Sequence, residues 1–130
     1  MRKVITILLL IVICLLSISA SAAEPDFFNQ NGFVKMRTTA YCCGTTTANG
    51  SAVHFGGCAA APEHMGDIAI VYLPDGYYVG MFECNDLGGT EAIRTGKVLD
   101  IYFPTLFECK EYMRLVGTGK IYVKYIHGNG

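Results

Sequence analysis

Short apolar runs, rich in β-branched and aromatic residues, recur along the chain and are separated by Gly, Pro, Asn and Asp. Runs of this kind, bounded by turn residues, are typical of β-strands. Only residues 105–115 repeat their apolar positions at the three- and four-residue spacing of a helix. The pattern predicts a mainly β protein, a small six-stranded barrel with one short helix. The pattern locates five of the strands, at 32–41, 67–73, 77–84, 97–103 and 120–126, and a long loop rich in Gly, Thr, Ser and Asn at 42–58.

The first residues read as an export signal rather than as part of the fold. Arg2 and Lys3 precede an almost wholly apolar run, Val4 to Leu16, and small residues follow at 17–23. This order predicts a signal peptide over residues 1–22, cleaved after Ala22 or Ala23. The alternative is an uncleaved membrane anchor, although the run is short for a membrane span. Residues 23–32 are then an N-terminal tail and 33–127 a single barrel domain, and we expect a secreted, extracytoplasmic protein.

Charge excludes one class of partner. The formal net charge of −1 becomes −3 when Arg2 and Lys3 are removed with the signal, and the chain has no basic run. Nucleic-acid binding therefore has no support. We expect a monomer that has no membrane contact after cleavage.

Cysteine usage predicts a disulfide-stapled domain. The chain has 6 cysteines, and five remain once Cys14 leaves with the signal. Thiols of exported proteins tend to pair, so at most two bridges and one leftover thiol are expected. Cys84 with Cys109 is one plausible bridge, and Cys58 with Cys42 or Cys43 would staple the long loop. Zinc is the alternative for clustered cysteines, but neither a CxxC nor a paired-His spacing is present, so no metal or other cofactor is expected.

Asp100 is the candidate for chemistry that the strand pattern singles out. It interrupts the apolar run at 97–103, and alternation places it on one face with Val98 and Tyr102. Burial of a carboxyl group raises its pKa, as a general acid requires near neutral pH. The alternative is an Asp on a solvent-facing sheet surface. Asp86 is the second candidate, because Gly88 and Gly89 beside it allow close backbone approach to a ligand, although such a segment is often just a turn.

Four segments in order also carry a family resemblance. Residues 85–89 (Asn-Asp-Leu-Gly-Gly) and 98–103 (Val-Leu-Asp-Ile-Tyr-Phe) resemble the core of the 3D domain, a family named for three aspartates. Residues 39–50 resemble its opening Thr-Ala-Tyr strand and Thr-Ala-x-Gly turn, and 58–67 resemble its Ala-x-Asp-Pro segment. The family is similar to the C-terminal barrel of the membrane-bound lytic transglycosylase A family. The resemblance covers about Thr38 to Ile126.

The resemblance implies a double-psi β-barrel that cleaves peptidoglycan glycan strands without a cofactor. Asp100 would protonate the oxygen between N-acetylmuramic acid and N-acetylglucosamine. It would then take the proton from the muramic C6 hydroxyl, which attacks C1 to give a 1,6-anhydro product. Asp86 would support it. Substrate contacts would come from Gly88, Gly89, Arg94 (or Lys97 in the same loop) and Tyr41.

Two departures from the family pattern keep a second function open. The position of the family's first aspartate is Ala61, and Glu63 lies on the wrong side of Pro62 to replace it. The interval between Asp86 and Asp100 is also longer than usual. The alternative is therefore a non-catalytic barrel that binds peptidoglycan or a protein partner, and a toxin-like or inhibitor role is a third reading.

Overall fold

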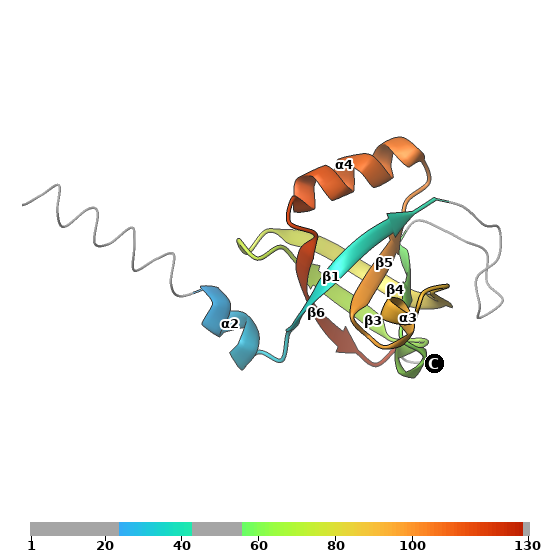
Figure 1. Ribbon diagram of the computed structural model, residues 1–130. Coiled ribbons are helices and arrows are strands. Elements are labelled where there is room, and N and C mark those ends of the chain that lie inside the picture. The colour runs from blue at the N-terminus through green and yellow to red at the C-terminus, as the bar shows by residue number, and fades with distance from the viewer. Residues whose placement is uncertain (1–23, 43–55, 129–130) are drawn as a thin grey trace, which may run out of the picture.

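The computed structural model describes residues 24–42 and 56–128 (Figure 1). Six strands form a closed barrel in the order β1-β5-β2-β4-β3-β6, which confirms the mainly β, six-stranded barrel. The predicted signal peptide and its cleavage site lie outside the described residues, as does Cys43. The strands are β1 (Val34–Tyr41), β2 (Gly57–Ala60), β3 (Ile68–Tyr72), β4 (Tyr78–Leu87), β5 (Val98–Tyr102) and β6 (Lys120–Ile126).

Two strands differ from the sequence prediction. β2 overlaps the predicted loop at 42–58 and consists of small residues with no β-branched side chain, so local propensity gave no signal for it. β4 runs past its predicted end at Cys84 to Leu87, which places Asp86 on a strand and not in a turn. The reason is tertiary: β2 pairs in parallel with β4, with Ala59 opposite Asp86, and this pairing supplies hydrogen bonds for the extended backbone.

The described residues contain more helix than the single one predicted. That helix is α4 (Leu106–Val116), which starts with a capping box between Thr105 and Glu108. Residues 24–30, predicted as tail, form α2 (Glu24–Gln30), which docks because the ring of Phe28 stacks on Tyr122 at 4.2 Å. The predicted loop between the two candidate aspartates contains α3 (Glu91–Arg94), capped by Thr90. A 3₁₀ turn, η1 (Pro62–His64), follows β2.

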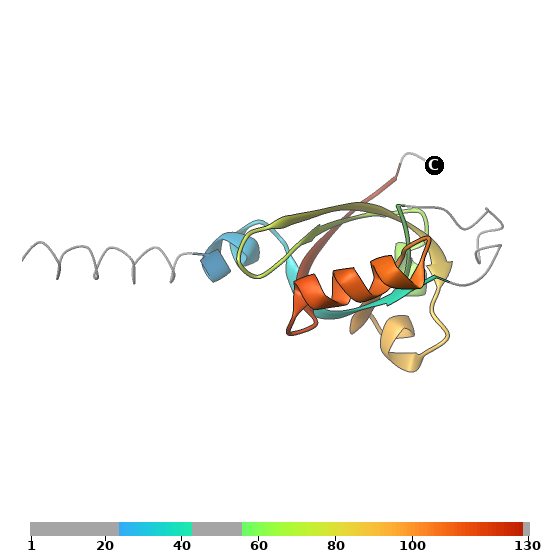
Figure 2. The same cartoon turned by 90° about the horizontal axis from the view of Figure 1, so that it is seen from above.

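The alternate residues of the strands fill the barrel interior. α4 lies along β1 (Figures 1 and 2). Leu99 and Ile101 of β5 are fully buried in this interior. Tyr112 and Val116 of α4 join the same core. The hydroxyl of Tyr112 lies 2.7 Å from Oγ1 of Thr38, which itself donates to the carbonyl of Leu99. Within the described ranges, no helix combines the length and apolar character needed to cross a membrane.

A buried carboxylate holds the end of the barrel where β3 begins. Asp67 is 6% exposed, and its two oxygens lie 3.0 Å from Nδ1 of His64 and 2.9 Å from Nδ1 of His127. The His64 ring stacks on Tyr125 at 3.6 Å. Burial raises the pKa of Asp67, but the hydrogen bonds from His64 and His127 outweigh it and hold that pKa below its usual value.

We expect Asp67→Asn to lower the free energy of unfolding near neutral pH by about 1.5–3 kcal/mol, the order of a hydrogen bond to a charged group. A carboxyl with a depressed pKa stabilises the fold above its unfolded-state pKa, and this contribution is lost as the pH falls through its folded-state pKa. Urea unfolding of variant and wild type should therefore converge in strongly acidic buffer. Glu63→Gln is the control, because Glu63 lies in the turn η1 just before Asp67 but is exposed. A difference that persisted in acid would contradict this account.

Candidate functional site

The two candidate aspartates lie in one row of residues across four neighbouring strands. In the barrel register, Thr39 of β1 is opposite Asp100 of β5, Asp100 is opposite Ala59 of β2, and Ala59 is opposite Asp86 of β4. Adjacent strands are about 4.8 Å apart, so the two aspartates are roughly 10 Å apart along the backbone row. Only the methyl group of Ala59 stands between them in this row.

The row faces the outside of the barrel, under partial cover. Leu99 and Ile101 point into the core, so Asp100 between them points outward, as the alternation predicts. Ala59 and Val98 on this face pack against Ile93 of α3, with Tyr41 beside them. Asp100 is half-buried as a result. Neither alternative from the sequence describes it fully: Asp100 is outside the core, yet it is shielded from solvent.

Asp100 combines burial, a hydroxyl donor and a like-charged neighbour. Burial raises its pKa, the hydrogen bond from Thr39 lowers it, and the charge of Asp86 raises it, with a net rise above the usual value. Oγ1 of Thr39 donates to Oδ1 of Asp100 at 2.8 Å. A carboxyl group of this kind retains its proton to higher pH than a free one, which is the condition for general-acid chemistry.

Tyr41, two residues beyond Thr39 on β1, contacts the other aspartate of the row, Asp86. Its hydroxyl donates to Oδ2 of Asp86 at 3.3 Å, and the backbone N–H of Leu87 donates to Oδ1 at 2.9 Å. Burial raises the pKa of Tyr41, and the charges of Asp86 and Asp100 raise it further. The phenol therefore stays protonated and donates to the Asp86 carboxylate. The structure thus brings Tyr41, Asp86 and Asp100 together.

The other predicted substrate residues shape the loop beside the row. A side chain at Gly88 would overlap Ile93, so this glycine is required for packing of α3. Gly89 has open space around its α-carbon, and its carbonyl accepts from Nη1 of Arg94 at 3.3 Å. Arg94 is exposed. These contacts give Gly88 and Arg94 a structural role in holding the loop after β4 against α3.

The position that the resemblance assigns to the family's first aspartate is buried in this structure. Ala61, which stands where the resemblance places an aspartate, is 2% exposed at the start of η1. Glu63 is exposed on η1 itself. Thr39 and Ile93, by contrast, were not identified as site residues from the sequence. Their roles depend on the β1–β5 register and the packing of α3, for which a single sequence carries no local signal.

The cysteines lie in different pairs from those expected. Cys84 faces Cys58, with 3.7 Å between the two sulfur atoms, and Cys42 lies near enough to Cys109 to raise the pKa of the Cys109 thiol. The expected Cys84–Cys109 bridge is wrong for this fold, because β4 places Cys84 opposite Cys58 on β2. All four are thiols in the structure. No group of three or more His, Cys, Asp and Glu suited to a metal ion occurs in the described part of the chain.

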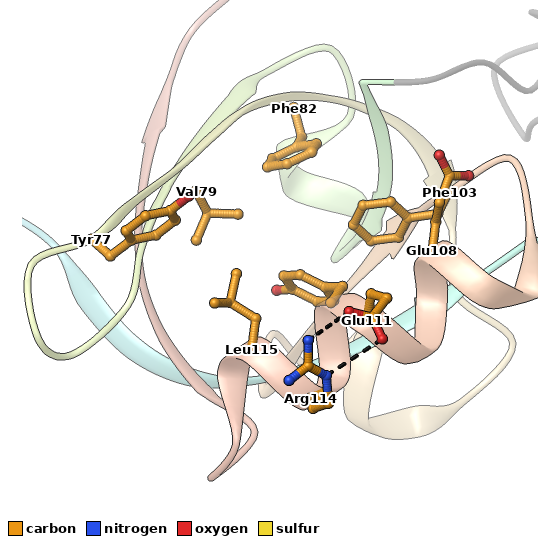
Figure 3. A pocket seen from close by; sticks show the side chains of 9 residues that line it. Tyr77, Val79, Phe82, Phe103, Glu108, Glu111, Arg114 and Leu115 are labelled. Carbon is orange, nitrogen blue, oxygen red and sulfur yellow. Dashed lines mark hydrogen bonds and ion pairs between the residues drawn. The ribbon is translucent and has the colours of Figure 1, made fainter.

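A cavity of about 410 Å³ lies between α4 and the β3–β4 hairpin, apart from the aspartate row (Figure 3). The rings of Tyr77, Phe82 and Phe103 surround it, and a Glu111–Arg114 ion pair lies at its edge. Its lining is largely apolar and includes neither candidate aspartate. Such a cavity suits an apolar group, not the proton chemistry of the row.

The chain matches no protein-family model and no curated protein.

Two substitutions should move the pKa of Asp100 in opposite directions. Thr39→Val removes the donor to its carboxylate, so the pKa should rise. Asp86→Asn removes the neighbouring charge, so it should fall. Carbon-13 NMR titration of the Asp100 carboxyl measures both. Shifts in the same direction would show that Thr39 and Asp86 do not act on Asp100 as their positions indicate.

Proposed function

We propose that this protein is a secreted domain that cleaves peptidoglycan glycan strands in the manner of a lytic transglycosylase. The observation that carries the proposal is the row itself: a half-buried Asp100 with a raised pKa, separated from Asp86 by the single strand β2, on a shielded outer face of the barrel. The order of the sequence motifs over nearly the whole domain supports the same family of reactions.

In the proposed reaction one carboxyl group serves twice. Protonated Asp100 donates its proton to the glycosidic oxygen as the bond to C1 of N-acetylmuramic acid breaks. The resulting carboxylate then accepts the proton of the C6 hydroxyl as its oxygen bonds to C1. The products are a 1,6-anhydro end and a free 4-hydroxyl end, and no water is consumed. Asp86, held by Tyr41, favours the protonated form of Asp100 before the reaction through its negative charge.

The proposal includes two finer features of the fold. We propose a double-psi topology, supported by the parallel pairs β1–β5 and β2–β4 within one closed barrel of six strands. We also propose that disulfides hold the domain, as suits a protein exported after removal of residues 1–22. The proposed location is the cell wall, where a monomer of this size would meet its substrate.

Digestion of purified sacculi tests the activity. After incubation with the protein, soluble fragments are analysed by mass spectrometry before and after borohydride reduction. We expect anhydro-muropeptides, which are lighter by one water than hydrolysis products and do not take up hydride. Reducible ends would instead indicate hydrolysis and contradict the transglycosylase reaction. Absence of any soluble fragment would contradict glycan cleavage altogether.

A non-catalytic wall- or protein-binding barrel is the second candidate. The observation that favours it is the buried methyl group of Ala61 where the family pattern has a carboxyl group. Sedimentation with insoluble peptidoglycan distinguishes the two candidates. Protein that pellets with sacculi and releases nothing supports binding, whereas release of anhydro ends supports catalysis.

A further inference from the structure

Two of the cysteines face each other inside the barrel. Cys58 and Cys84 are opposite residues of the parallel strands β2 and β4, and they are 0% and 1% exposed. Their sulfur atoms are 3.7 Å apart. Adjacent strands separate their α-carbons by about 4.8 Å, which lies inside the range of about 4.4–6.8 Å found across disulfides. Rotation of the two side chains can therefore join the sulfurs without moving either strand.

The other two described cysteines meet where β1 ends. Cys42 follows the last residue of β1 and is half-buried, and Cys109 lies on α4 and is 6% exposed. Burial raises the pKa of Cys109 to about 11, and the charge and hydrogen bond of Cys42 add to this rise. α4 packs against β1, where the Tyr112 hydroxyl lies 2.7 Å from Oγ1 of Thr38, and this packing brings Cys109 near the end of β1, which Cys42 follows. Cys43 is the remaining cysteine of the domain.

We propose that the protein carries two disulfides, Cys58–Cys84 and Cys42–Cys109, and that Cys43 stays a thiol. Each bridge forms by exchange with a small-molecule or protein disulfide: the two thiols lose two protons and two electrons, and the oxidant is released as two thiols. The adjacent residues Cys42 and Cys43 cannot bond each other without strain. This connectivity replaces the pairing expected from the sequence.

Both bridges border the aspartate row. Cys58 precedes Ala59, and Cys84 lies two residues before Asp86, so the first bridge fixes the two strands on which these row members lie. Cys42 follows Tyr41, so the second bridge anchors the end of β1, where the Tyr41 hydroxyl donates to Asp86. The bridges would hold the carboxyl groups at constant spacing. The connectivity itself does not depend on the proposed glycan cleavage.

Peptide mapping of the full chain tests the connectivity. The protein is refolded with oxidised and reduced glutathione, its free thiols are alkylated, and it is digested without reduction. Cleavage after Glu63, Glu83 and Glu108 separates Cys84 and Cys109 from the other three cysteines of the domain, and cleavage after Phe55 then separates Cys58 from Cys42 and Cys43. We expect the Cys84 peptide joined to the Cys58 peptide, and the Cys109 peptide joined to the peptide of residues 42–55.

The proposal is overturned if the Cys84 peptide is joined to the Cys109 peptide, or if all five thiols of the domain are alkylated. Two matched variants resolve the neighbouring cysteines. The Cys109 link should survive Cys43→Ser and disappear in Cys42→Ser, and the reverse result would reject the Cys42–Cys109 bridge. The peptide map needs no substrate. If it shows the two proposed bridges but the protein does not cleave glycan, the result contradicts the proposed function and not the connectivity.

Discussion

Asp100→Asn should lower the release of anhydro-muropeptides by at least about a hundredfold, the lower end of what general acid–base catalysis contributes. The amide matches the carboxyl group in size and can still accept the hydrogen bond from Thr39. It cannot deliver a proton to the glycosidic oxygen or take one from the C6 hydroxyl. Initial rates of sacculus digestion at matched protein concentration measure the effect.

Stability separates this loss from unfolding. The pKa of Asp100 is raised in the fold, so ionisation of this residue opposes folding as the pH rises above its unfolded-state pKa. A neutral amide is therefore not expected to lower the free energy of unfolding near neutral pH. Asp75→Asn is the control, since Asp75 is exposed in the β3–β4 turn and its Oδ1 accepts from Tyr77 N–H as an amide oxygen also could. Asp100→Asn protein with most of its activity would rule out Asp100 as the acid.

Gly88→Ala should destabilise the domain by about 1–3 kcal/mol, the usual cost of overpacking a fitted contact. A β-carbon at this position would overlap three side-chain atoms of Ile93. Ile93 is 4% exposed and packs α3 against Ala59 and Val98 behind the aspartate row. To make room, α3 has to move away from β2 and β5, so glycan release should fall together with stability.

The neighbouring glycine provides the control for this prediction. Gly89→Ala places a methyl group in open space and should change the free energy of unfolding by less than about 0.5 kcal/mol, as surface substitutions usually do. Shortening Ile93 to Val should relieve part of the overlap, so the double variant should lose less than the sum of the single losses. Urea unfolding of the four proteins measures the coupling. Equal effects of the two glycine substitutions would show that the Ile93 contact is not the cause.

The strand alternation around Asp100 was readable from the sequence, because Leu99 and Ile101 flank it and the pleat period is two. The helix α4 and the five strands other than β2 were predicted in the same way, because their apolar positions repeat with the period of a helix or a strand. β2 was not predicted, since small residues such as Ala59 and Ala60 form a strand here only because β4 and β5 pair with them. The cysteine pairs and the Thr39 contact were missed because both depend on strand order. Strand order is a property of the closed barrel, whereas the sequence shows only local periods.

The position of β2 between β4 and β5 also bears on how the protein folds. Asp86 and Asp100 are near each other in the chain, yet β2, the strand that lies between them, comes from earlier residues. Thr39 is 61 residues before its partner Asp100. Closing such long loops precedes any gain from the contacts, which slows folding. The row is therefore expected to appear only in the last step of barrel closure. A partly folded chain would carry both acids without the arrangement of the row, and so is expected to be inactive until the barrel has closed.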